Sequence, residues 1–234
     1  MELDMFLYRI NRKANTEDEL NLINKSIQIS DENELGKLEE VVGFIRNNDN
    51  EAYIKSNYKM FIDEFIKAYM SVKDKTKDEI DNEMYDENNE IVYIYNSLTA
   101  KEVINCVEKE KEQDVKLYEY ITNNKDIINN IRVDDIGYWR KHPDLHKIME
   151  DKYYEKGGEG TFNCKALILS KEEIENIIKL ADDIISGKVE SEKATGFFWG
   201  ESIEDDWIDT KEIFEKTLKE TDFDNETVYY DSWW

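Results

Sequence analysis

The chain has 234 residues, of which 40% are hydrophobic and 12% aromatic, so it can bury a sizeable core and wholesale disorder is excluded. Its formal net charge of -24 repels the phosphates of nucleic acids and the anionic surface of membranes, which disfavours direct binding to either. One alternative stays open, in which the acidic surface imitates DNA and occupies a basic groove of another protein.

The start of the chain, MELDMFLYRINRK, has no basic segment followed by a long apolar run, so it does not resemble a signal peptide. No stretch approaches the roughly 18 apolar residues that a membrane span requires. We therefore expect a cytoplasmic protein that does not bind membranes.

Apolar periodicity and capping pairs predict one strand followed by helices in the first part of the chain. Thr16 and Glu19, for example, have the spacing of a capping box. We expect a strand at 3–8 and helices at 16–29, 35–46 and 58–72.

The middle of the chain continues with helical patterns. The very polar segment 73–90 is predicted to be an exposed acidic insertion, and 91–95 to be a strand or the start of a buried helix. Helices are expected at 99–107, which opens with the capping pair Thr99 and Glu102, and at 114–131.

In the last hundred residues, strand and helix patterns alternate. The segment 135–154 has a helical pattern interrupted by Pro143, which predicts either a kink or a helix that restarts at the proline. The remaining elements are expected to be strands at 162–169, 194–199 and 227–234, with helices at 170–187 and 206–219.

This order predicts an α+β fold, in which helices pack on an antiparallel or mixed sheet built from the N-terminal and C-terminal strands. We expect residues 1–234 to form a single domain whose middle region, 14–134, is largely helical.

The two cysteines, Cys106 and Cys164, are isolated from each other in the sequence. They indicate neither a disulfide framework nor a zinc site. We expect both to be small buried apolar residues.

Several segments together resemble a family of small proteins common in phage and prophage genomes. The resemblance comes from MELDMFLYR at the start, IGYWRKHPDLHKI at 136–148, CKALILSKEEIENII at 164–178, TGFFWG at 195–200 and VYYDSWW at the end. Members often carry a kinase label, but this sequence has no GxxxxGK[ST] phosphate loop to support one. The resemblance implies a phage-encoded accessory protein that acts in the cytoplasm of the infected cell. His142 and Pro143 depart from the family, whose corresponding segment is an unbroken helix.

One stretch combines an aromatic plate, a cation and both histidines of the chain. On an uninterrupted helix, Trp139, His142 and His146 would share one face. Such a group suits an anionic planar ligand, which stacks on the ring and pairs with the cation. The alternative is that Trp139 belongs to the core and His146 packs there. The candidate ligand-binding residues are Tyr138, Trp139, Arg140, His142 and His146.

Carboxylates gather between a predicted strand and a predicted helix at Glu201, Asp205 and Asp206. Acidic residues are favoured at helix starts by the helix dipole, which explains the cluster without a ligand. The alternative is a Mg²⁺ or Ca²⁺ site, because both ions prefer oxygen ligands. No other cofactor is expected.

The C-terminal strands carry many aromatic residues, and alternation would bury half of them and expose the other half. The candidate partner surface comprises Phe198, Trp199, Tyr230, Trp233 and Trp234. Core packing is the alternative use of these rings. An exposed aromatic patch is typical of a surface that binds another protein.

No Ser-His-Asp or Cys-His catalytic pattern emerges, so the sequence favours a non-enzymatic role. The leading hypothesis is a phage accessory protein that binds and neutralises a host protein, such as a defence component, in the manner of an anti-CRISPR-like inhibitor. The first alternative is a protein that sequesters or hydrolyses a nucleotide-like ligand through Trp139, Arg140 and His146, and the second is a structural or regulatory phage protein.

Overall fold

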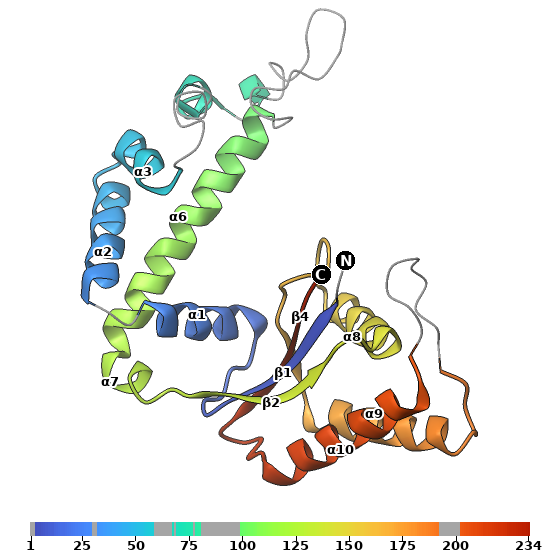
Figure 1. Cartoon of the computed structure of the whole chain (residues 1–234). Helices are drawn as coiled ribbons and strands as arrows, with labels where there is room; N and C mark the ends of the chain where they lie inside the picture. Colours follow the sequence, from blue (N-terminus) through green and yellow to red (C-terminus); the bar gives the residue numbers. More distant parts are fainter. Residues whose placement is uncertain are drawn as a thin grey trace, which may run out of the picture. The chain divides into compact units, whose positions relative to one another are not determined.

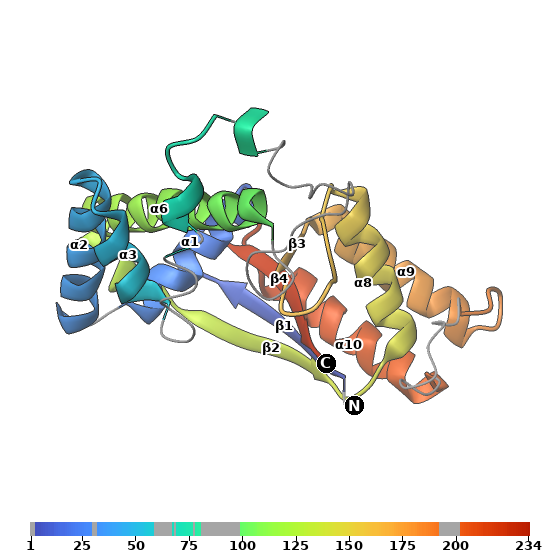
Figure 2. The ribbon, with the colours of Figure 1, turned by 90° about the horizontal axis from the view of Figure 1, so that it is seen from above.

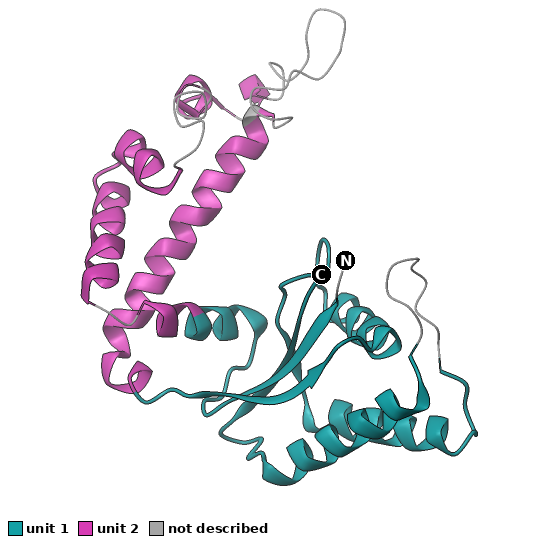
Figure 3. Ribbon diagram, in the orientation of Figure 1, with its two compact units in different colours: residues 1–24, 130–234 teal, residues 25–129 magenta. Residues whose placement is uncertain are grey.

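The computed structural model describes residues 3–29, 32–58, 67, 69–76, 78–80, 99–191 and 202–234. The chain divides into two compact units, shown in different colours in Figure 3. Unit 1 comprises residues 1–24 and 130–234, and unit 2 comprises residues 25–129.

Unit 1 is built around a four-stranded antiparallel sheet with the order β2-β1-β4-β3. Its strands are β1 (Asp4–Ile10), β2 (Val133–Trp139), β3 (Leu167–Leu169) and β4 (Thr227–Trp233), and Figure 1 shows β1 between β2 and β4. The predicted α+β fold, with a sheet formed by N-terminal and C-terminal strands, is confirmed.

One face of this sheet is covered by helices α8 (Pro143–Glu155), α9 (Lys171–Ile185) and α10 (Glu204–Glu220). Helices α9 and α10 lie side by side in Figures 1 and 2. Strand alternation sends Met5 and Leu7 into the core below them, and both are fully buried. Leu145 of α8, Ile174 of α9 and Phe214 of α10 belong to the same core, so this layer holds unit 1 together.

Local capping signals fix where these helices begin. Ser170 and Glu173 form a complete capping box at the start of α9, as the sequence predicted. In α8, Pro143 is the first helical residue, so the predicted restart at the proline is confirmed. The predicted helix at 206–219 and the predicted strands at 3–8 and 227–234 correspond to α10, β1 and β4.

Two predictions for unit 1 were wrong. Residues 133–139 form strand β2 instead of the first half of a helix, because they pair with β1 in register from Met5 opposite Trp139 to Ile10 opposite Val133. The strand predicted at 162–169 is only three residues long, since Leu167–Leu169 alone pair with β4.

Unit 2 covers most of the middle region. Its described elements include the helices α2 (Glu32–Arg46), α3 (Asn50–Asn57) and α6 (Ala100–Asn123) and the short helix α7 (Lys125–Ile128). Helix α1 (Glu17–Gln28), predicted at 16–29, begins in unit 1 and continues into unit 2. A small core around Tyr53, Ile54 and Val103 packs α3 against α6.

The helix boundaries in unit 2 differ in part from those predicted. Thr99 caps α6 through the predicted capping box, but the helix continues unbroken from the segment predicted at 99–107 into that predicted at 114–131 and ends at Asn123. Helix α3 was missed. In the segment 73–90, where an exposed insertion was expected, Thr76 and Glu79 cap a helical turn whose Ile80 is only 8% exposed.

The remaining predicted elements, at 91–95 and 194–199 and over most of 58–72, lie outside the described residues, as do residues 81–90 of the predicted insertion. Whether the whole chain forms one domain stays a prediction. None of the described helices has the length and apolar character needed to cross a bilayer.

Candidate functional site

The predicted ligand-binding stretch is divided among a strand, a connection and a helix. Tyr138 and Trp139 end β2, Arg140 follows it, and His142 immediately precedes α8, which contains His146. The expectation that Trp139, His142 and His146 share one helical face was therefore wrong. Because neighbouring strand residues point to opposite sides of a sheet, Tyr138 and Trp139 face different environments.

Trp139 lies in the core of unit 1. Its side chain is 5% exposed and stacks on Phe214 with ring centroids 5.8 Å apart. The indole Nε1–H donates a hydrogen bond to Oγ1 of Thr210 at 2.9 Å. The ring and its polar atom are thus both satisfied within the protein.

His142 is fully buried and caps helix α8. Its Nδ1 accepts a hydrogen bond from the Leu145 N–H at 3.4 Å and lies 2.8 Å from Oγ of Ser202. An Nδ1 that accepts from a backbone N–H is unprotonated, so the Ser202 hydroxyl is the donor in the second contact. The same hydroxyl oxygen accepts the N–H of Asp144 at 3.1 Å.

Burial makes His142 a weak base. It lowers the pKa of His142 to about 4, partly opposed by the nearby Asp144 carboxylate. A general base that activates a serine works best with a pKa near the working pH. The contact between His142 and Ser202 is therefore suited to capping a helix and poorly suited to nucleophilic catalysis.

His146 is also fully buried in this core. Its Nδ1 lies 2.8 Å from the Tyr230 hydroxyl, and its ring stacks on Phe162 at 5.5 Å. Burial lowers the pKa of His146 to about 4, so both histidines are neutral near pH 7. Neither histidine therefore places a cation on the Trp139 ring, as the predicted ligand site would require.

The predicted partner surface is also divided. Trp233 is 60% exposed, whereas Tyr230 is fully buried and belongs to the core, because the two residues lie on opposite faces of β4. Trp234 is partly buried, and its Nε1–H donates to the Phe162 carbonyl oxygen at 3.2 Å. Phe198 and Trp199 lie outside the described residues.

The sheet face opposite α8, α9 and α10 carries a continuous row of rings. Tyr138 of β2 contacts Phe6 of β1 at 5.2 Å, Phe6 stacks on Tyr8 at 5.7 Å, and Tyr8 contacts Tyr229 of β4 at 5.2 Å. Tyr138 is 46% exposed and Tyr229 only 5%. This arrangement follows from alternation, because Phe6 and Tyr8 alternate along β1 with the core residues Met5 and Leu7.

Carboxylates frame this row of rings. Asp4 accepts a hydrogen bond from the Tyr138 hydroxyl at 2.6 Å, and this bond raises the pKa of Tyr138. Asp231 lies opposite Phe6 in the pairing of β1 with β4, and Asp135 lies opposite Tyr8 in the pairing of β1 with β2. We define the aromatic–acidic face as Phe6, Tyr8, Tyr138 and Tyr229 with Asp4, Asp135 and Asp231.

This face has a negative electrostatic character. The pKa of Tyr8 is raised by burial and further by Asp135 and Asp231, which oppose a second negative charge nearby. Burial also raises the pKa of Asp231 itself. The face therefore combines apolar ring surface with negative potential, a combination suited to cationic groups.

Two of the three predicted metal ligands, Asp205 and Asp206, lie at the start of helix α10. Asp206 lies in the first turn of α10, where its Oδ2 accepts the Ile203 N–H at 2.7 Å. Asp205 lies beside it in the same turn, where the helix dipole stabilises carboxylates. Within the described parts of the chain, no group of three or more His, Cys, Asp or Glu residues could hold a metal ion. Glu201 lies outside those parts.

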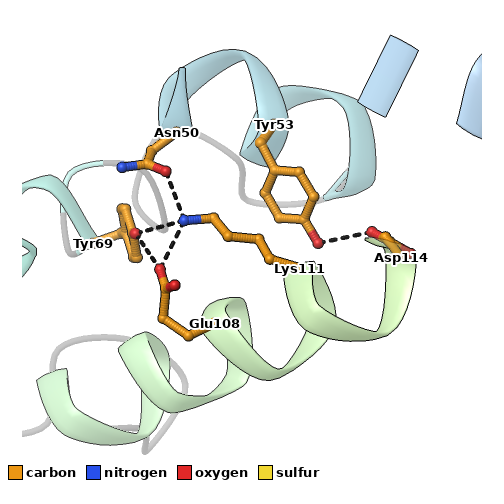
Figure 4. A network of polar contacts seen from close by, with 6 residues as sticks. All are labelled: Asn50, Tyr53, Tyr69, Glu108, Lys111 and Asp114. Atoms are coloured by element: carbon orange, nitrogen blue, oxygen red, sulfur yellow. Dashed lines mark hydrogen bonds and ion pairs between the residues drawn. The ribbon is translucent and has the colours of Figure 1, made fainter. Parts of the chain in front are cut away.

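Unit 2 contains a second polar cluster, drawn in Figure 4. The Lys111 ammonium donates to Oδ1 of Asn50 at 2.6 Å, to the Tyr69 hydroxyl at 3.0 Å and to Oε1 of Glu108 at 2.7 Å. Its side chain is only 9% exposed. A hollow of about 570 Å³ lies beside it, but the ammonium has three donors and all three are used. The cluster therefore holds Asn50 of α3 and Tyr69 against α6.

The two cysteines were expected to be buried, but Cys106 and Cys164 are both exposed and free. Burial of a small side chain depends on its neighbours in the folded protein, and local pattern did not reveal that Cys106 lies on the solvent side of α6.

The fold and the site together define an acidic α+β protein with an aromatic–acidic sheet face. Comparison with models of protein families, with curated proteins and with solved structures found no match to this chain. Sequence reasoning missed Phe6, Tyr8 and Asp231 as surface residues. The signal that could have found them is the alternation of Phe6 and Tyr8 with Met5 and Leu7 in the first strand.

Proposed function

We propose that the protein binds and neutralises a host protein in the cytoplasm of a phage-infected cell, without catalysing a reaction. The observation that carries this proposal is the aromatic–acidic face of unit 1, which presents exposed ring surface beside negative charge. The resemblance to phage accessory proteins supports a host factor as the partner, and a component of host defence is the target we favour.

The chemistry of the face supports protein binding. Aromatic side chains with partial exposure provide large contact areas at a small cost in side-chain entropy, and they are frequent energetic anchors in interfaces. Tyr138 is 46% exposed and Trp233 is 60% exposed, on adjoining parts of the sheet. The net charge of -24 accelerates encounter with a basic partner surface and disfavours acidic ones.

The surroundings of the histidines support a role other than catalysis. His142 and His146 are fully buried, and burial lowers the pKa of each to about 4. Trp139 is fixed between Phe214 and Thr210. These groups stabilise the core of unit 1, whereas the Tyr138 ring of the same stretch is exposed and available for contact.

The test is capture of a partner from host lysate with the tagged protein at low and at high salt. We expect a stoichiometric partner that is retained by the wild type and lost by Tyr138→Leu. Tyr154→Leu is the matched control, because Tyr154 is 45% exposed in helix α8 and its hydroxyl also donates to an oxygen, the Gly160 carbonyl at 3.0 Å.

Two results would overturn the proposal. The first is the absence of any stoichiometric partner together with unchanged phage fitness on deletion of the gene in defended hosts. The second is a partner that both tyrosine variants retain equally well, since the aromatic–acidic face would then have no part in its binding.

A further inference from the structure

We infer that the aromatic–acidic face recognises arginine side chains presented by the protein partner. This inference rests on the proposed function and adds the chemical group that the face takes. It follows from the arrangement of the rings, from the carboxylates between them and from the overall charge.

The rings form a contiguous, electron-rich row, with tilts of 43° between Phe6 and Tyr138 and 33° between Tyr8 and Tyr229. Phe6 and Tyr8 are nearly parallel, with an interplanar angle of 12° and a centroid distance of 5.7 Å, and Tyr138 extends the row from β2. A cation placed over the face of an aromatic ring within about 6 Å of its centroid is attracted by the ring quadrupole. A guanidinium group can also stack flat on such rings, which a compact ammonium cannot do.

The carboxylates of the face supply the second half of the site. Asp231 is partly buried beside Phe6, and the described residues provide no ion pair to it. Asp135, opposite Tyr8, likewise has no ion pair among the described residues. Asp4 forms a long ion pair, in which the Arg140 Nε lies 3.9 Å from its Oδ1. Burying a carboxylate without a cation is unfavourable, so a cationic group from outside would relieve the cost at Asp231.

The net charge decides among possible occupants. A second copy of the chain, also at -24, would be repelled, and so would a nucleic acid or an anionic membrane. A basic segment of another protein is attracted. Arginine suits the face better than lysine, because its planar fork pairs with a carboxylate through two hydrogen bonds while its plane covers a ring.

The sheet face is a better docking surface than the sheet edge. Strand β2 is an outer strand of the described sheet, but its pairing with β1 shifts register between Leu7 and Tyr8, which inserts Ile136 as a bulge. A bulge interrupts the regular hydrogen-bonding geometry that an added strand needs. Side chains that approach from above the rings do not depend on that geometry.

The experiment uses two fluorescein-labelled heptapeptides, one of alternating glycine and arginine and one of alternating glycine and lysine with equal charge. Fluorescence anisotropy measures their affinity for the full chain at low and high salt. We expect the arginine peptide to bind about fivefold more tightly than the lysine peptide, as ring stacking predicts. Equal affinity for the two peptides would overturn the inference.

Variants then locate the binding site. Asp231→Asn and Tyr138→Leu should each weaken binding of the arginine peptide by about fivefold. Glu212→Gln removes the same charge as Asp231→Asn from an exposed position on α10, and it should change affinity less than about twofold. Equal losses in Asp231→Asn and Glu212→Gln would mean that the peptide responds to net charge alone, which also contradicts the inference.

The two proposals fail in different ways. If the lysate partner is lost with Tyr138→Leu but the peptides do not distinguish arginine from lysine, protein binding stands and arginine recognition falls. If the arginine peptide binds as expected but no lysate partner depends on Tyr138, the face recognises arginine and the proposed host-factor function falls. Thermal unfolding of each variant checks that the fold is intact, and the exposed position of Tyr138 makes Tyr138→Leu the safer variant of the two.

Discussion

The two faces of the sheet in unit 1 are built from the same strands and use aromatic residues in opposite ways. On the covered face, Leu7, Val228 and Tyr230 are fully buried beneath helices α8, α9 and α10. On the other face, Phe6 and Tyr8 are only partly buried and alternate with these core residues along β1. The covered face also takes up Trp139 and His146, whereas Tyr138 remains accessible.

This difference shows that the face of the sheet to which a side chain points decides its role more than its residue type does. Tyr229 and Tyr230 are neighbours, yet Tyr230 contacts the histidine in the core and Tyr229 contacts Tyr8 on the other face. Apolar content on the covered face supplies stability, whereas exposed rings on the other face, such as Tyr138, are available for binding. Substitutions on each face separate these two contributions.

The largest expected effect is the loss of a core side chain. Leu7→Ala should lower the free energy of unfolding by about 2–5 kcal/mol, because it leaves a cavity in a fully buried position. Phe6→Ala, at the adjoining residue on the other face, should cost clearly less and should weaken partner capture. Urea unfolding of both variants measures the contrast. A larger stability loss in Phe6→Ala than in Leu7→Ala would break the distinction between the faces.

The buried histidines should make the covered face sensitive to acid. Both have a pKa of about 4 in the folded protein, below the ordinary value of 6.5, so the unfolded chain binds protons more readily. Their stabilising contribution is present above about pH 6.5 and is lost as the pH falls towards the folded pKa. Between about pH 7.5 and pH 5, each histidine should cost about 2 kcal/mol of unfolding free energy.

His142→Asn isolates one of these contributions. Asparagine is a favourable N-cap, so its side-chain oxygen can accept the Leu145 N–H in place of Nδ1 without titrating. The variant should lose less stability than the wild type between neutral pH and pH 5, measured by urea unfolding at each pH. An unchanged pH dependence would show that His142 does not titrate as its burial requires.

A smaller effect is expected where β2 approaches helix α10. A Cβ at Gly137 would lie 2.7 Å from Cγ2 of Ile213 and 3.2 Å from Cβ of Leu7, so Gly137→Ala should destabilise by about 1–3 kcal/mol. Gly36→Ala is the control, because a Cβ there meets nothing within 4 Å and the residue lies inside α2. That control should stabilise by about 0.5–1 kcal/mol. Thermal unfolding measures the stability of both variants. An alanine at 137 that leaves stability unchanged would mean that β2 does not pack closely against Ile213 and Leu7.

The smallest expected effect has the opposite sign. Burial raises the pKa of Asp231, so its charged form is disfavoured in the folded protein near neutral pH. Asp231→Asn should therefore raise the urea midpoint slightly at neutral pH while it weakens binding, the usual exchange between stability and function at a binding site. The difference should vanish in acid, where the wild-type carboxyl is protonated. A lower midpoint in the variant would argue that the charge supports the fold.

Local signals explain how much of the fold could be predicted from the sequence. The capping boxes at Thr99 and Ser170 were found because each depends on two residues three positions apart. Strand β2 was not found, because its partner is far away in the chain: Arg9 and Asp134, which are paired in the sheet, are 125 residues apart. Because this strand was predicted as a helix, Trp139, His142 and His146 were wrongly expected to share one helical face.

The candidate site could be predicted only in part, for a related reason. The stretch from Tyr138 to His146 was recognised as unusual, and it does include an exposed ring, but strand parity buries Trp139 beside it. Asp231 was overlooked because a single carboxylate between aromatic residues has no local signature. Its position opposite Phe6 exists only after β1 and β4 have paired.

The most direct test of the account is partner capture by a double variant, Tyr138→Leu with Asp231→Asn, compared with the double control Tyr154→Leu with Glu212→Gln. Both carry the same chemical changes, one on the aromatic–acidic face and the other on helices of the covered face. We expect the first variant to lose the host partner at an unchanged or slightly higher thermal midpoint, while the control keeps it. Retention of the partner by the first variant, or equal loss by both, would contradict the assignment of binding to this face of the sheet.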